Sequence, residues 1–150
     1  MKLSSKNNSA SLPFFTGAWP VVIGHRGAAG TCPENTLLSF SQALAEGAGI
    51  IECDLHLSRD GVPVIIHDDT VDRTTEGTGL ANDLTLAELK ALDAGYRFTK
   101  DNGQSFLFRG QGHAIPTLDE VLDTFPDTRF CFELKDQGAA LVERTIDLLI

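Results

Sequence analysis

The stretch VVIGHRGAAGTCPENTLLSFSQALAEGAGIIECDLHL, residues 21–57, decides the fold. It begins with the apolar run 21–24 and ends with the apolar run 50–57, and each has the composition of a strand. Between them, apolar residues recur at helical spacing until Gly47 and Gly49 supply a stop. A strand, a helix and a strand in so short a span form a βαβ unit, whose strands are parallel. The sequence therefore predicts an α/β fold.

Further elements follow along the chain. Strands are expected at 62–67 and 129–134, and helices at 84–95 and 117–125. Both helices begin with a threonine followed three residues later by a glutamate, the capping-box pattern. These pairs are Thr85 with Glu88 and Thr117 with Glu120.

Three segments depart from this alternation. Residues 1–20 are polar and are expected to form a flexible tail. The interval 70–115 is too long for a simple connection, and we interpret it as an insertion after the third strand. The final helix carries an apolar stripe that needs a partner surface, so the chain is expected to end before its fold does. The stripe consists of Leu141, Val142, Ile146, Leu149 and Ile150.

Composition narrows the classes of function. A net charge of −9 argues against a nucleic-acid partner, because a row of phosphates would stay unneutralised. No apolar stretch reaches the roughly 20 residues of a transmembrane helix, and the N-terminus lacks a signal-peptide core. The three cysteines form neither a disulfide framework nor a zinc pattern, which favours reduced thiols and a cytoplasmic location.

The run 50–57 contains the first candidate functional residues. Side chains alternate across a strand, so Glu52, Asp54 and His56 share one face and apolar residues share the other. Two neighbouring carboxylates are costly to bury without a compensating positive charge, and Mg²⁺ or Ca²⁺ supplies it through oxygen ligands. Taken by itself, the pattern is better explained by an exposed edge strand. Glu133 in the run 129–134 offers a third carboxylate, and Lys135 on the same face could hold a substrate anion.

Two histidines stand where strands end, the position at which catalytic groups gather in parallel α/β proteins. His25 follows the first run and His67 the third, and two imidazoles can serve as acid and base in one turnover. The alternative for either is a buried, backbone-bonded histidine. Arg26 is suited to bidentate phosphate contacts. Together with the acidic cluster, these residues indicate metal-assisted cleavage of a phosphate ester. We assign no role to His56 and expect a loop position for His113.

Four blocks of sequence resemble, in order and spacing, the signatures of the glycerophosphodiester phosphodiesterase family. They are GHRGAAGTCPENTLLSF, IECDLHLSRDGVPVIIHDDTVDRTTEGTG, IPTLDEVL and FELK, and the resemblance covers about residues 21–137. It implies a TIM-type (β/α)8 barrel with a small insertion after the third strand. In a chain of 150 residues, only about the first four βα units are expected, over 21–150.

The resemblance also implies roles for individual residues. His25 and His67 are expected to be the acid–base pair. The carboxylates of Glu52, Asp54 and Glu133 are expected to bind Mg²⁺ or Ca²⁺. Arg26 and Lys135 are expected to contact the substrate phosphate. Glu34 is expected to lie at the mouth of this site.

The resulting hypothesis is metal-dependent hydrolysis of small-molecule glycerophosphodiesters to glycerol 3-phosphate and an alcohol. The alternative is an inactive half-barrel that binds a phosphorylated ligand, or that needs a second copy or a missing C-terminal half for activity. A third, weaker hypothesis is a phospholipase D-like relative that acts on intact lipids.

Overall fold

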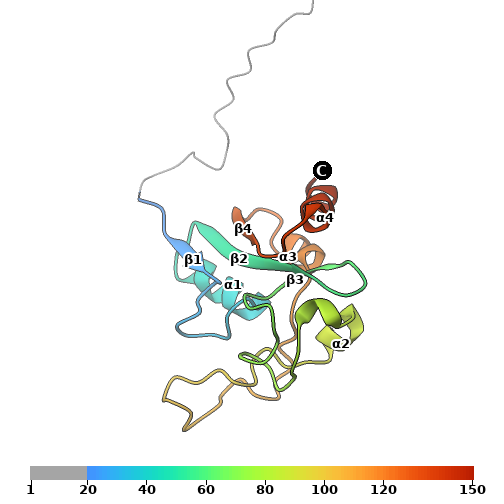
Figure 1. Cartoon of the computed structure of the whole chain (residues 1–150). Coiled ribbons are helices and arrows are strands. Elements are labelled where there is room, and N and C mark those ends of the chain that lie inside the picture. The colour runs from blue at the N-terminus through green and yellow to red at the C-terminus, as the bar shows by residue number, and fades with distance from the viewer. Residues whose placement is uncertain (1–19) are drawn as a thin grey trace, which may run out of the picture.

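The structure is a computed structural model that describes residues 20–150. The flexible tail expected over 1–20 lies almost wholly outside the described residues. No described helix is both long and apolar enough to cross a membrane. Figure 1 shows a small sheet with helices packed against it and a long looped segment that extends away from the sheet.

Strand β2 (Ile50–Leu57) is the centre of the sheet. Strand β1 (Ile23–His25) pairs with it in parallel, His25 lying opposite Glu52. Strand β4 (Phe130–Leu134) also pairs with β2 in parallel, along the other edge. The βαβ unit predicted from 21–57 is therefore present, with helix α1 (Leu37–Ala45) as its crossover.

Strand β3 (Pro63–Ile65) corrects one expectation about the sheet. It forms at the predicted place but runs antiparallel to β2, so it is a hairpin strand rather than the start of a βα unit. The connection from Ser58 to Val62 is far shorter than the dozen or more residues that a parallel crossover requires, and Gly61 adopts the positive φ of the turn. Residues 20–150 thus contain three parallel strands where four βα units were expected.

The position of β3 along β2 matters for the site. Leu55 pairs with Leu134 of β4 and with Ile65 of β3, so these two strands lie on opposite edges of β2. Strand β3 therefore lies on the same edge as β1, and the amide of Ile66 continues that ladder by donating to the carbonyl of Asp54. As a result, β1 and β3 approach each other nearly end to end, with His25 and His67 at the facing ends.

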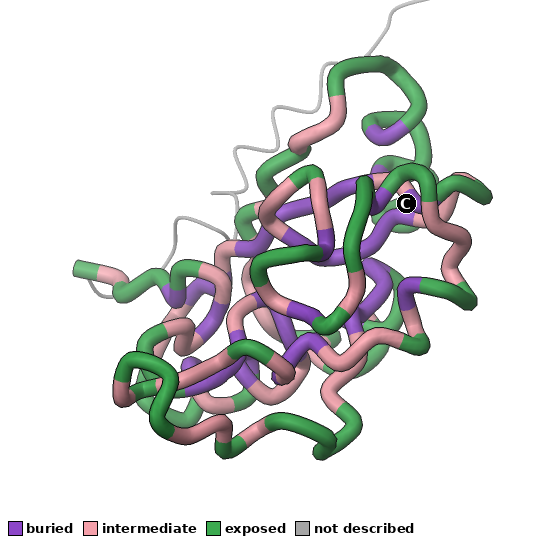
Figure 2. The backbone as a smooth tube through the Cα atoms, turned by 60° about the horizontal axis from the view of Figure 1, so that its bottom comes forward, coloured by how far each residue is buried: buried purple, intermediate pink, exposed green. Residues whose placement is uncertain are grey.

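The alternation predicted for β2 separates a core from a polar face. Ile51, Cys53 and Leu55 are fully buried beneath helices α1, α3 (Leu118–Thr124) and α4 (Ala139–Leu149). The remaining members of this core are Phe40, Ala43, Ile65, Leu118, Val121 and Leu141. Figure 2 shows the buried residues gathered in the middle of the molecule and exposed residues along its outer loops.

The segment 66–115 packs as a second layer. It contains the short helices η2 (Ala81–Asp83) and α2 (Leu86–Lys90) and has its own apolar cluster. The cluster consists of Val64, Ile66, Val71, Ala81, Leu89, Ala94 and Ile115. Because Val64 and Ile66 flank the end of β3, this cluster anchors the segment against the sheet.

The apolar stripe expected on the last helix is only partly a packing face. Leu141 is buried against the core, and Thr145 one turn later is buried beside it. Val142, Ile146 and Leu149 are 44%, 47% and 52% exposed. The helix is rotated so that Leu141 and Thr145, four residues apart, set its inward face.

Both predicted capping boxes form, and the one at α3 generates a stability prediction. The hydroxyl of Thr117 accepts from the amide of Glu120, whose carboxylate accepts from the amide of Thr117. We expect Thr117→Ala to lower the free energy of unfolding by about 1 kcal/mol, because the cap is lost. Urea denaturation measures the change, with Thr78→Ala, an exposed loop threonine, as the matched control. Equal stability of the two variants would contradict the prediction.

Candidate functional site

Three carboxylates meet on the polar face of the sheet. Glu52 and Asp54 project from β2, and Glu133 on β4 lies opposite Asp54 in the parallel ladder. One oxygen from each residue lies within 4.8 Å of the others. Asp54 is buried, Glu52 is half-buried and Glu133 is exposed, so the cluster runs from the interior to solvent. Oxygen ligands in this arrangement suit a hard divalent cation.

The Asp54 carboxylate is the buried centre of the cluster, with its side chain 1% exposed. Its Oδ2 accepts from Nδ2 of Asn35 at 2.8 Å and lies 3.5 Å from Nε of Arg26. Its Oδ1 lies 3.1 Å from Nζ of Lys135. A buried charge is tolerated only when it is paired and hydrogen-bonded, and here three different segments supply the partners.

Buried oxygens and net charge both fit a divalent cation at this cluster. Oδ1 of Asn35 is buried and receives no hydrogen bond from any described residue, and the buried Oδ1 of Asp54 has the ammonium of Lys135 as its ion-pair partner. The connected site groups contain five carboxylates and three cations, so with neutral histidines two negative charges remain uncompensated. The carboxylates are Glu34, Glu52, Asp54, Asp68 and Glu133, and the cations are Arg26, Arg73 and Lys135.

The pKa of Glu52 is raised mainly by burial. Burial, reinforced by the neighbouring charge of Asp54, raises this pKa above its ordinary value despite a hydrogen bond from the amide of Arg26. A bound cation would oppose that effect, because it favours the ionised carboxylate.

The His-Arg-Gly turn after β1 is held in one conformation. Arg26 has a left-handed backbone, with φ of 57°, and its amide donates to Oε2 of Glu52 at 2.9 Å. Its carbonyl accepts from the hydroxyl of Ser39 on α1 at 3.0 Å. Gly27 has φ of 81°, and a Cβ there would lie only 2.4 Å from Oγ of Ser39. The turn thus needs glycine, and it directs Arg26 toward the carboxylates.

Glu34 joins two arginines rather than lying free at the mouth. Nη1 of Arg26 donates to Oε1 at 3.0 Å, and Arg73 donates to both oxygens at 2.7 and 2.8 Å. Burial opposes ionisation, but the hydrogen bonds from Arg73 and Arg26 outweigh it, so the pKa of Glu34 lies below its ordinary value. Glu34 is therefore an ionised anchor for both guanidinium groups.

His67 is oriented by the residue that follows it. Its Nδ1 lies 2.6 Å from Oδ1 of Asp68, whose carboxylate also accepts from Arg73. The hydrogen bond from Arg73 is the main reason that the pKa of Asp68 falls to about 2. Since Asp68 is then ionised, the shared hydrogen belongs to Nδ1 of His67. Nε2 of His67 is left as the ring nitrogen that can exchange a proton.

His25 and Lys135 complete the set of predicted site residues. The His25 side chain is 71% exposed, and its Nε2 lies 3.9 Å from Oε2 of Glu52. Nζ of Lys135 lies 2.8 Å from Oε1 of Glu133. Burial lowers the pKa of Lys135, but its pairing with Glu133 and Asp54 outweighs this and raises it, so Lys135 stays an ammonium.

The structure brings all eight predicted site residues into one connected group. Six of them meet around the carboxylates of Glu52 and Asp54. Glu34 joins these six through Arg26, and His67 joins through Asp68, Arg73 and Glu34. The eight are His25, Arg26, Glu34, Glu52, Asp54, His67, Glu133 and Lys135. His113 lies apart from this group in its loop, its ring packed edge-on against Phe108.

Sequence reasoning missed several residues in this group. Asn35 directly follows Glu34 and is the hydrogen-bond donor to Asp54, while Asp68 and Arg73 follow His67 in the chain. Their only signal was proximity to the selected histidine and glutamate, because no periodicity reveals which side chain a loop turns inward.

His56, to which no role was assigned, is buried beside the site. Its Nδ1 lies 2.7 Å from Oδ1 of Asp136, and its Nε2 lies 3.2 Å from the carbonyl of His67. Asp136 also accepts from the amide of Leu57 at 2.6 Å. His56 thus connects the segment after β4 with the backbone that carries His67.

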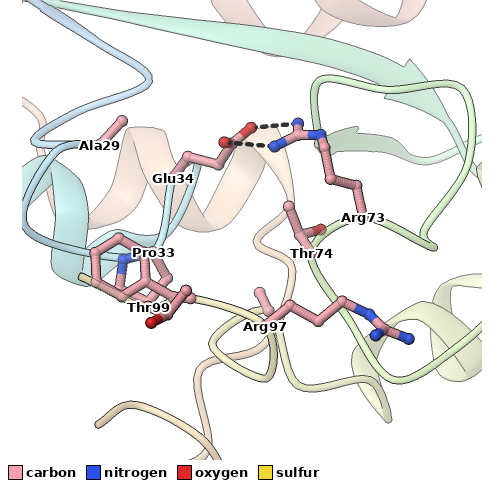
Figure 3. A pocket seen from close by; sticks show the side chains of 9 residues that line it. Ala29, Pro33, Glu34, Arg73, Thr74, Arg97 and Thr99 are labelled. Carbon is pink, nitrogen blue, oxygen red and sulfur yellow. Dashed lines mark hydrogen bonds and ion pairs between the residues drawn. The ribbon is translucent and has the colours of Figure 1, made fainter. Parts of the chain in front are cut away.

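An open pocket of about 330 Å³ borders the pair formed by Glu34 and Arg73. Figure 3 shows the bidentate contact between Glu34 and Arg73 on one wall, with Pro33, which precedes Glu34, and Thr99, which comes from the segment 66–115, below it. Arg97 and Phe98 also line it. The pocket thus lies between the loop after β1 and the segment 66–115.

Comparison with known proteins gives one family. Residues 25–142 match the model of the glycerophosphoryl diester phosphodiesterase family. A glycerophosphodiester phosphodiesterase from Caldanaerobacter subterraneus subsp. tengcongensis is 45% identical over 115 residues, which cover 77% of this chain and 44% of the relative. The chain thus spans less than half the length of that curated relative.

Two solved structures resemble the model. The glycerophosphoryl diester phosphodiesterase domain of a Mycobacterium tuberculosis protein aligns with a TM-score of 0.79 at 30% identity, covering 87% of this chain and 47% of that one. An Oleispira antarctica phosphodiesterase in complex with the product sn-glycerol-3-phosphate gives a TM-score of 0.75 at 41% identity, covering 87% and 51%. The predicted fold class, part of a TIM-type barrel, is thereby confirmed.

The environment of Asp68 predicts a change in acid stability. Its pKa is about 2 in the folded chain against an ordinary value of 3.8, so its stabilising contribution is complete above pH 3.8 and is lost as the pH falls toward 2. Between pH 4 and pH 2, we expect the melting temperature of Asp68→Asn to fall by less than that of the wild type. Calorimetry at several pH values measures this, with Asp123→Asn, an exposed carboxylate on α3, as control. Parallel melting curves for wild type and Asp68→Asn would refute the assignment.

Proposed function

The chain belongs to the glycerophosphoryl diester phosphodiesterase family, and from that premise we propose that it hydrolyses glycerophosphodiesters to glycerol 3-phosphate and an alcohol. One observation carries the proposal: His25 at the end of β1 and His67, two residues after β3, are joined by one network of contacts to Arg26 and a three-carboxylate cluster. The product complex of the Oleispira antarctica relative supports glycerol 3-phosphate as the product.

In the proposed reaction, the two histidines move the protons. One accepts a proton from the nucleophile, either water or the neighbouring glycerol hydroxyl, as its oxygen attacks phosphorus. If the glycerol hydroxyl attacks, the product of this step is a cyclic phosphate, which water then opens to glycerol 3-phosphate. The other donates a proton to the alcohol oxygen as the P–O bond breaks. The hydrogen bond to Asp68 favours Nε2 as the proton-transfer atom of His67. His25 is exposed and is open to a substrate that enters from solvent.

The cations of the site bind and orient the phosphate. Arg26 presents a guanidinium that is already held by Glu34, so little side-chain freedom is lost when substrate binds. Lys135 supplies a second positive charge on the opposite side of Asp54. Both favour the charge that builds on the phosphate oxygens during attack.

Glu52, Asp54 and Glu133 are proposed to hold Mg²⁺ or Ca²⁺. When bound, such a cation supplies further positive charge next to the phosphate. The partner that we propose for this reaction is a small-molecule glycerophosphodiester.

Two further parts of the interpretation stay proposals. We interpret 70–115 as the insertion that borders the substrate mouth, and the pocket between this segment and Glu34 supports that view. The three cysteines are free thiols, which supports the proposed cytoplasmic location. A second copy or a further C-terminal segment is the alternative route to an active barrel, since the chain spans about half of its solved relatives.

Turnover by the 150-residue chain tests the acid–base proposal. We expect glycerol 3-phosphate release from glycerophosphocholine, and a loss of about 10²–10⁴-fold in both His25→Ala and His67→Ala. His113→Asn is the matched control and should stay within about twofold of wild type, since His113 lies apart from the site. Near-normal turnover in both variants would eliminate the two-histidine scheme. A folded wild type that binds metal without turnover would favour the inactive half-barrel.

Metal dependence has its own test. Treatment with EDTA should abolish turnover, and added Mg²⁺ or Ca²⁺ should restore it. We expect Asp54→Asn to weaken metal binding at least tenfold in titration calorimetry, because it removes the buried ligand. Glu143→Gln, an exposed carboxylate change on α4, should bind as wild type does. Equal affinity of Asp54→Asn and Glu143→Gln would place the cation elsewhere.

A further inference from the structure

Arg73 makes four hydrogen bonds to two carboxylates that come from different loops. Nη1 and Nη2 donate to Oε2 and Oε1 of Glu34 at 2.8 and 2.7 Å, the contact drawn in Figure 3. Nε and Nη2 donate to Oδ2 and Oδ1 of Asp68 at 2.6 and 3.1 Å. The planar guanidinium thus donates hydrogen bonds from all three of its nitrogens. An ammonium cannot reproduce this geometry.

Each of these carboxylates has a second partner in the reaction site. Glu34 also accepts from Nη1 of Arg26, and Asp68 also accepts from Nδ1 of His67. Glu34 therefore connects Arg73 to Arg26, the proposed phosphate-binding residue. Asp68 connects Arg73 to His67, the proposed acid–base residue. Arg73 is the link through which His67 joins the rest of the site.

The backbone around Arg73 is rigid enough for this task. Val71 is fully buried in the second apolar cluster, and Thr75 is fully buried two residues after Arg73. The hydroxyl and amide of Thr75 both donate to the carbonyl of Val71. The carboxylate of Asp72 accepts from the amide of Gly79 and closes the loop. The guanidinium therefore projects from a fixed turn.

We propose that Arg73 is a positioning residue that fixes the ring of His67 and the guanidinium of Arg26 at once, by fastening the carboxylate to which each is bonded. The inference rests on the proposed function. Without Arg73, Asp68 and Glu34 would be two neighbouring carboxylates held only by their remaining partners.

The expected effect is on turnover more than on stability. The Arg73 side chain is 46% exposed, and ion pairs in such solvent-exposed positions contribute little to folding stability. Catalysis is more sensitive, because a displacement of about 1 Å in a reacting group can cost about 10²-fold in rate. Removal of the side chain should therefore leave a folded chain with a disordered His67.

The test compares Arg73→Ala and Arg73→Lys with Arg59→Ala. Arg59 is an exposed arginine that pairs with Glu88 far from the site, so it controls for the loss of a surface ion pair. We expect Arg73→Ala to lower kcat for glycerophosphocholine by about 10²-fold. Arg73→Lys should recover only part of the loss, and Arg59→Ala should lose none. Turnover of Arg73→Ala within twofold of wild type would overturn the proposal.

A spectroscopic readout separates this inference from the proposed function. In ¹⁵N-labelled protein, Nδ1–H of His67 should give a proton resonance, because its hydrogen bond to Asp68 slows exchange with water. The resonance is assigned by its absence in His67→Asn. We expect Arg73→Ala and Asp68→Asn to lose it, and Glu34→Gln and Arg59→Ala to keep it. A resonance that persists in Arg73→Ala would overturn the inference even if the enzyme is active. Its loss there would support the inference even in a chain without turnover.

Discussion

The structure depends on one costly feature, the burial of the Asp54 carboxylate beneath the polar face of β2. Such a charge must be paired, and its partners come from the turn after β1, the loop before α1 and the end of β4. Satisfying Asp54 therefore draws the connection between β1 and α1 and the end of β4 toward β2. The conformation of the His-Arg-Gly turn, with its left-handed Arg26, follows from this requirement as much as from any property of the turn itself.

From Asp54, a series of ion pairs and hydrogen bonds runs outward to His67. Arg26 is held by Glu34, Glu34 by Arg73, and Arg73 by Asp68, which orients His67. Each cation in this chain is shared by carboxylates from different loops, so a displacement at one end is transmitted to the next group. The connected carboxylates and cations together nevertheless keep two uncompensated negative charges, and a divalent cation at Glu52, Asp54 and Glu133 is the simplest species that would neutralise them.

Part of the sheet could be predicted from local pattern, and part could not. The alternation in β2 separated Ile51, Cys53 and Leu55 from Glu52 and Asp54 correctly, because a strand exposes one face every second residue. The direction of β3 was not predicted. Its composition is that of a buried strand in either orientation, and only the short turn at Gly61 distinguishes a hairpin from a crossover.

The sequence by itself determined the family, the two faces of β2, the capped helices and the identity of the residues that gather at the strand ends. These depend on periodicity and on motifs within one stretch of chain. Only the tertiary structure decided that β3 turns back along β2 and brings His67 toward His25, and that Arg73 contacts Glu34, 39 residues earlier. Strand register and loop path fix such contacts, because they depend on how distant segments pack together and leave no periodic trace in the sequence.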